Sequence, residues 1–248
     1  MPHWEIALFF FTIAILYSSV GFGGGSSYLA ILALYGLDYR LLRFTALLCN
    51  IIVVSGGVYI FYKNGHVQIK KILPLVFLSV PFAFLGGSLK IQESTFFIIL
   101  GFALIVAALL MLFQNTNLNS VKNATKNYLL TNSVLGGSIG FLSGLVGIGG
   151  GIFLAPILHL IKWDQTKVIA ATASFFILVN SIAGLSGQLT AGVGNIDWQM
   201  IGILVVAVFL GGQIGSRLGA IKFNPLVVRR MTAVLVLFVG GRILWKYF

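Results

Sequence analysis

Charged residues are scarce in this sequence, and their scarcity decides its class. Only 8% of the 248 residues are charged and 58% are hydrophobic, with a mean hydropathy of +1.03. A soluble domain carries about 25% charged residues. The composition therefore predicts an all-α integral membrane protein that crosses the cell membrane several times.

Cysteine and histidine are also rare, which excludes several kinds of site. Cys49 is the one cysteine, so no internal disulfide or thiolate metal cluster is available. The three histidines are far apart and show no ligand spacing. The apolar segments contain no serine–histidine, paired-aspartate or metal constellation. We therefore expect neither a metal nor a cofactor, and we do not expect an enzyme.

The formal net charge of +11 comes from 16 basic and 5 acidic residues. In a soluble protein this excess would suggest nucleic acid as the partner. Here the basic residues are scattered between apolar segments, which is typical of membrane orientation and of contact with anionic lipids. We expect the lipid bilayer as a partner and no nucleic acid; whether the chain forms a homo-oligomer is left open.

Long hydrophobic runs are abundant and account for most of the chain. Most have the length needed to cross a hydrocarbon core of about 30 Å as a helix. The first and fifth runs are interrupted by glycines at Val20–Ser27 and Val146–Gly151. The runs cover residues 4–35, 42–62, 72–89, 95–113, 128–161, 167–187, 198–220 and 226–246.

The two glycine interruptions belong to halves that resemble each other. Val146 follows Val20 by 126 residues, and the same offset aligns the glycines and places Asp164 on Asp38. The polar residues between the halves form the obvious linker. The sequence thus predicts a first membrane repeat at 1–113, a linker at 114–127 and a second repeat at 128–248, each repeat with about four apolar segments.

The repeats are either parallel or inverted, depending on whether each broken segment crosses the membrane or returns as two half-helices. A crossing segment divides the basic residues 7 to 9 between the two faces, whereas a returning segment divides them 5 to 11. The positive-inside bias favours the second arrangement, with inverted repeats and both termini on the non-cytosolic face.

The glycine interruptions are the candidate binding site. Irregular backbone at membrane depth persists only where it is buried in protein or lines a cavity, and paired breaks indicate a transporter's site. The sequence lacks both the dinucleotide fingerprint and the phosphate-loop ending. A helix that restarts after the glycines offers amide N–H groups to an anion. The candidate substrate-binding residues are Gly21, Gly23, Gly24, Gly25, Ser26, Ser27, Thr45, Asn50, Gly147, Gly149, Gly150, Gly151, Thr172 and Asn180.

Several other residues have expected structural roles. Ser26 and Ser27 stand where helix N-caps would, and Asp38 and Asp164 are placed to cap helix starts. Glycines at four-residue spacing predict close helix packing at 136–144 and at 211–219. No Lys, Arg, Asp or Glu is expected deep in any span, so a buried acidic proton relay is not expected.

The motifs VGFGGGS at 20–26 and VGIGGGIFLAP at 146–156, together with the repeat, resemble the sulfite exporter TauE/SafE family of membrane permeases. The ending adds Gly215-Ser216-Arg217-Leu218, Asn224-Pro225, Arg229-Arg230 and Gly241-Arg242 to this similarity. The resemblance implies a multi-pass permease for sulfur-containing anions. The first half departs from the pattern at Lys90, where the second half has Gly215 followed by Arg217. Because the two halves do not share this basic residue, Arg217 is interpreted as an anchor at the cytosolic end and not as part of the site.

These observations favour a secondary permease or facilitator for a small anion, and the resemblance implies a sulfur-containing one such as sulfite, a sulfonate or sulfoacetate. The alternative is a non-transporting membrane scaffold or an assembly partner of another complex. A scaffold would be marked by a long soluble loop or a large polar face, and the sequence shows neither.

Overall fold

A computed structural model describes residues 4–19, 21–113, 128–194, 196–218 and 225–248, and the regular structure in them is helical. The helices are α1 (Trp4–Ser19), α2 (Gly25–Leu34), α3 (Tyr39–Lys63), α4 (Ile69–Ser88), α5 (Glu93–Phe113), α6 (Tyr128–Val146), α7 (Gly151–Leu160), α8 (Thr166–Ala191), α9 (Trp198–Leu218) and α10 (Pro225–Tyr247).

The apolar pattern predicted these helices well. Each unbroken run corresponds to one helix, and each broken run corresponds to two helices that flank a glycine cluster. Six helices (α3, α4, α5, α6, α8 and α9) are long and apolar enough to cross a membrane, whereas α1, α2 and α7 are shorter. The prediction of an all-α, multi-pass membrane protein is confirmed.

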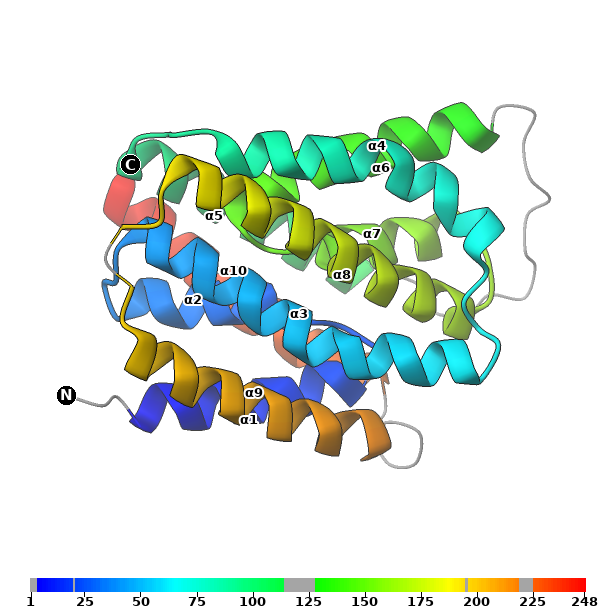
Figure 1. Ribbon diagram of the computed structural model, residues 1–248, viewed down its shortest axis with the longest axis horizontal. Helices are drawn as coiled ribbons and strands as arrows, with labels where there is room; N and C mark the ends of the chain where they lie inside the picture. Colours follow the sequence, from blue (N-terminus) through cyan, green and yellow to red (C-terminus); the bar gives the residue numbers. More distant parts are fainter. Residues whose placement is uncertain (1–3, 20, 114–127, 195, 219–224) are drawn as a thin grey trace.

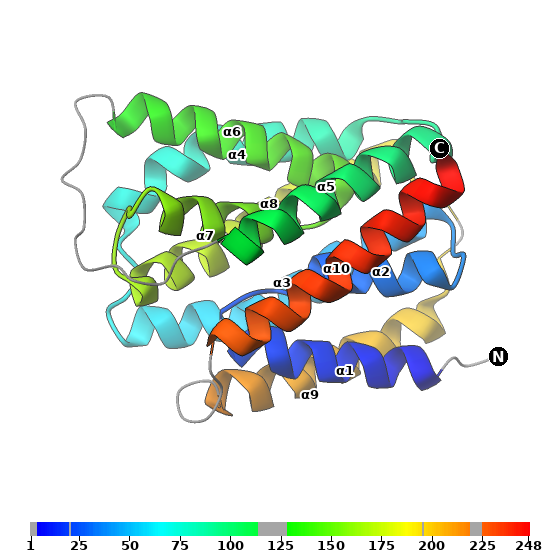
Figure 2. The same cartoon turned by 180° about the vertical axis from the view of Figure 1, so that it is seen from behind.

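The direction of the helices shows how the broken runs are arranged (Figures 1 and 2). α1 begins and α10 ends at one end of the bundle, here called the terminal end, while α5 ends and α6 begins at the opposite end. α2 returns toward the terminal end from which α1 came, and α7 returns toward the opposite end from which α6 came. Each broken run is thus a helical hairpin.

Each half of the chain therefore consists of one hairpin followed by three long helices. The two hairpins open toward opposite ends, which is the arrangement expected of inverted repeats. The repeat and the domain division remain predictions, and the proposed linker at 114–127 lies outside the described residues.

Small residues bring two pairs of helices into close contact. α6 packs on α4 and α9 packs on α1. A Cβ added at Gly136, Gly140 or Gly144 would collide with a backbone carbonyl of α4, and one added at Gly211 or Gly215 would collide with a carbonyl of α1. The predicted close packing is confirmed at these positions; Gly219 lies outside the described residues.

The two aspartates expected at helix starts differ in role. Asp38 is the N-cap of α3, because its side chain accepts hydrogen bonds from the backbone N–H groups of Arg40 at 2.9 Å and Leu41 at 3.3 Å. Asp164 is not a cap: the N-cap of α8 is Gln165. Asp164 instead forms an ion pair of 2.5 Å with Lys71 at the start of α4.

Positive charge is concentrated at the opposite end. Of the eleven basic residues that the sequence grouped on one face, eight are described, and all belong to helix ends or connections at this end. These residues are Lys63, Lys70, Lys71, Lys162, Lys167, Arg217, Arg229 and Arg230. The positive-inside rule therefore assigns the opposite end to the cytosol.

This orientation can be tested with single cysteines in a Cys49→Ser background. Phe248 at the C-terminus is 88% exposed, and Asn64 is exposed in the connection between α3 and α4. A membrane-impermeant maleimide added to intact cells should label Phe248→Cys, and should label Asn64→Cys only after permeabilisation. Labelling of both variants from one side would contradict the arrangement.

Candidate functional site

The first glycine break turns the chain from α1 into α2. Gly21 has φ 81° and Gly24, the N-cap of α2, has φ 89°, both in the left-handed region that favours glycine. The N–H groups of Ser27 and Tyr28 donate to the Gly24 carbonyl at 3.0 and 2.9 Å. The N–H groups of the first two residues of α2 have no acceptor within the helix, as at any helix start.

The second break has a similar geometry, with one more glycine at positive φ because Gly149 is left-handed and the aligned Gly23 is not. Gly147, Gly149 and Gly150 have φ values of 87°, 86° and 84°, and Gly150 is the N-cap of α7. The N–H groups of Phe153 and Leu154 both donate to the Gly150 carbonyl at 3.1 Å. The half-helices thus begin at the last glycine of each cluster, and the cap is the glycine before it.

Asn50, on α3, lies between the two breaks. Its Nδ2 donates to the backbone carbonyl of Ile148 in the second break at 2.9 Å. A Cβ added at Gly23, Gly25 or Gly149 would collide with the Asn50 amide. Glycine at these positions therefore allows both breaks to close on one side chain.

Each break is joined to the other half of the chain by the side chain of one residue. Asn50 belongs to the first half and binds the second break. Ser174 belongs to α8 in the second half, and its Oγ donates to the backbone carbonyl of Gly21 in the first break at 2.5 Å. Ile177 of α8 also faces both breaks, since a Cβ at Gly23 or Gly149 would approach it. The two breaks and helices α3 and α8 form one buried centre.

The starts of the two half-helices differ in polarity. Beside the first break, the hydroxyl groups of Tyr17 and Ser27 are 2.5 Å apart in a buried hydrogen bond. The hydroxyl groups of Ser26 and Tyr28 are buried there without a hydrogen-bond partner among the described residues. In the second half, Ile152 and Phe153 occupy the positions of the two serines. Hydroxyl groups at the start of the half-helix are therefore confined to the first half, whereas Ser143 and Ser181 bring buried hydroxyl groups to the second break from α6 and α8.

The structure assigns Ser26 and Ser27 roles different from those expected of caps. Neither serine caps α2, since Gly24 is the N-cap and no side chain caps it. Ser27 instead joins α2 to α1 through Tyr17. Both serines are buried beside the break; the capping interpretation is wrong, and their role in binding a substrate stays a prediction.

The remaining candidates are buried, with mixed contacts. Thr45 and Thr172 are fully buried, and their hydroxyl groups lack a partner among the described residues. Asn180 donates from Nδ2 to the Phe176 carbonyl of its own helix at 2.8 Å. The contacts around the glycines thus single out Asn50, and they do not place Asn180 at the breaks.

One charge is buried within a predicted span: Arg43, the fifth residue of α3, lies one turn from the helix start and not deep in the span. Its side chain is 3% exposed, and Nη2 donates to the backbone carbonyls of Gly86 at 3.3 Å, Gly87 at 3.2 Å and Gly144 at 3.1 Å. A Cβ at Gly147 would meet Arg43 Cα at 3.0 Å, so this residue adjoins the second break.

A sequence signal for Arg43 was present. Arg43 lies in the apolar run that begins at 42, and the Asp38 cap starts α3 at Tyr39, so Arg43 is one turn inside the helix. After the aspartates the alignment of the halves slips by one residue, to an offset of 127, so Arg43 corresponds to Ala170, against which a Cβ at Gly21 would pack. The sequence could therefore have located the position, but not the contacts of its guanidinium group.

A multi-pass helical bundle with two broken hairpins meeting at its centre has the architecture of a membrane transporter. Comparison with known proteins gives the family. The family model named Sulfite exporter TauE/SafE matches residues 6–243, so the chain belongs to this family. The resemblance inferred from the glycine motifs is confirmed.

The curated relatives are also named as membrane transporters. The probable membrane transporter protein y4hK of Sinorhizobium fredii is 34% identical over 245 residues, which cover 97% of each chain. A probable membrane transporter protein of Methanocaldococcus jannaschii is 25% identical over 89% of this chain and 87% of its own. The Bacillus subtilis protein YjnA, with the same description, is 24% identical over 94% and 96%. No solved structure matches the chain.

The hydrogen bond between Tyr17 and Ser27 allows a matched test of the first hairpin. Tyr17→Phe leaves Ser27 without its partner, so the free energy of unfolding should fall by about 0.5–1.5 kcal/mol. Tyr28→Phe makes the same change at an equally buried hydroxyl group that has no partner, and should leave stability unchanged or raise it. Unfolding in detergent micelles measures both; an equal loss in the two variants would contradict the assigned hydrogen bond.

Proposed function

We propose that the protein moves a small anion, of the sulfur-containing kind such as sulfite, a sulfonate or sulfoacetate, through a site between its two glycine breaks. The observation that carries this proposal is the convergence of both breaks on Asn50. Gly25, the first residue of α2, adjoins the Asn50 amide and the Ile148 carbonyl of the other break. The start of α2 therefore lies against the break that precedes α7.

The chemistry at this centre favours an anion. Helix N-termini carry about half a positive charge and present unpaired N–H groups. The hydroxyl groups of Ser26 and Tyr28 and the amide of Asn50 add neutral groups that can donate to an oxyanion. Each of the five acidic residues lies at or beside a helix end, so none opposes an anion at the centre. These residues are Glu5, Asp38, Glu93, Asp164 and Asp197.

The family name supports a sulfur oxyanion as the substrate. Sulfite offers three acceptor oxygens to a site made of N–H and O–H donors. Donors of this kind contribute about 0.5–1.5 kcal/mol each in net terms, so a few of them hold an anion and still allow its release. Arg43, adjoining Gly147, supplies a fixed positive charge on one side of the site.

Transport requires the centre to open. In the described arrangement, the Asn50 side chain and Ile177 occupy the space between the breaks. An anion that takes the donors of this site must displace the Asn50 amide from Ile148. Because each break is held by a helix of the other half, movement of the hairpins against α3 and α8 would expose the site to one end at a time.

Substituting the cap glycines tests this function. Gly24→Val and Gly150→Val place a branched side chain at φ values of 89° and 84°, against Tyr28 and Phe176 respectively. Both variants should insert into the membrane but lose at least about tenfold in sulfite uptake, because the amides can no longer approach the anion. Uptake of sulfite, thiosulfate, a sulfonate and a carboxylate into proteoliposomes provides the measurement.

Gly65→Val is the matched control. Gly65 also has a positive φ, 71°, but nothing lies within 4 Å of an added Cβ. This variant should retain uptake, which separates backbone strain from the filling of the site. Normal flux from Gly24→Val or Gly150→Val would show that the breaks serve packing alone, and a wild-type protein that moves none of the four anions would overturn the proposed function.

A further inference from the structure

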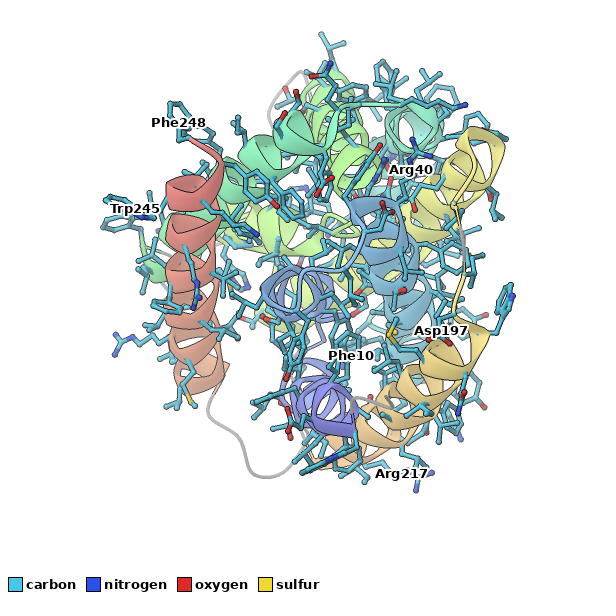
Figure 3. The ribbon with its side chains drawn as sticks, turned by 90° about the vertical axis from the view of Figure 1, so that its left-hand side faces the viewer. Phe10, Arg40, Asp197, Arg217, Trp245 and Phe248 are labelled. Atoms are coloured by element: carbon cyan, nitrogen blue, oxygen red, sulfur yellow. The ribbon has the colours of Figure 1, made fainter. Side chains whose placement is uncertain are left out.

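A cluster of basic and amide side chains lies toward the terminal end of the bundle. It surrounds a small cavity that is open to solvent and encloses about 10 Å³, which is room for about one water molecule. The start of α3, the end of α4 and the end of α8 form its walls. Figure 3 looks onto this end, where Arg40 lies among these three elements.

The lining of this cavity is strongly positive. It includes Arg40, Arg43 and Lys90, and no acidic residue belongs to it. Arg40 and Lys90 are exposed, whereas Arg43 is buried at the base. In the described part of the chain, the one ion pair joins Lys71 to Asp164 at the opposite end, so these three cations have no carboxylate partner among those residues.

Two buried side chains at this cavity retain unused hydrogen-bonding groups. Arg43 directs Nη2 at three carbonyls, but its Nε has no partner among the described residues. Gln188, on α8, is 4% exposed, and neither atom of its amide group has a partner there. Leaving such groups unpaired is costly, so the pattern points to a ligand. A guanidinium edge beside an amide N–H matches an oxyanion.

The cavity is connected to the glycine centre through Arg43. The same side chain lines the cavity, binds the Gly144 carbonyl near the end of α6 and adjoins Gly147 of the second break. We propose that this cavity is an access site that binds a small oxyanion at the non-cytosolic end, on its path to or from the glycine centre. The inference rests on the proposed function, since it takes the bound anion to be the transported one.

Sidedness distinguishes this access site from the central site. Gln188→Leu removes the amide and leaves no hydrogen bond broken among the described residues. In right-side-out vesicles it should raise the KM for external sulfite about three- to tenfold, the effect of one hydrogen bond, with kcat unchanged. In inside-out vesicles, where sulfite enters from the other end, its KM should equal that of wild type.

Charge variants at the same end provide a second readout. Arg40→Gln should raise the external KM and weaken its dependence on salt concentration. Arg242→Gln removes one exposed charge from the terminal end outside the cavity, and should leave the KM unchanged. Arg43→Lys keeps the charge but loses the guanidinium edge, and should raise the external KM if the variant folds.

The KM values and the uptake by the wild-type protein test the access site and the proposed function separately. If the wild-type protein takes up sulfite and Gln188→Leu and Arg40→Gln have normal KM values from both sides, the access site is wrong while the proposed function stands. An equal rise in KM from both sides would assign Gln188 to the central site and also overturn the access site. If the wild-type protein moves no anion, the proposed function fails, and this inference fails with it.

Discussion

A helix that breaks inside an apolar bundle exposes carbonyl groups that must be paired, and this constraint organises the centre of the molecule. An unpaired polar group costs several kcal/mol where no water can reach it. The carbonyl of Gly21 is paired by Ser174 and that of Ile148 by Asn50. Each pairing side chain belongs to the half opposite the break that it binds, so the two halves are held together where the chain is least regular.

Much of the fold was readable from the sequence, because membrane helices follow apolar run length and glycine clusters mark where those runs break. Both breaks form helical hairpins, as expected for broken runs that return as two half-helices. The capping role of Asp38 could also be predicted from the sequence, because it depends on backbone N–H groups only two and three positions away. The corresponding Asp164 was misread, since its partner Lys71 is distant in sequence and comes near only when α4 and α8 pack together.

The site itself was only partly readable. The glycines and Asn50 stood out because such residues are unusual within spans. With the one-residue slippage, however, the halves align Asn50 with the apolar Ile177, and nothing local shows that both side chains face the two breaks. Arg43 was missed for a similar reason. Its burial depends on carbonyls at the ends of α4 and α6, and no pattern within α3 reveals these acceptors.

The central claim is that the transported anion binds where the two breaks meet. Selenite has the charge and shape of sulfite and scatters anomalously, so a crystal of the protein soaked in selenite would locate the site directly. The account predicts an anomalous peak beside Asn50, between the starts of α2 and α7. Peaks confined to the basic surface of the opposite end, with none beside Asn50, would contradict it.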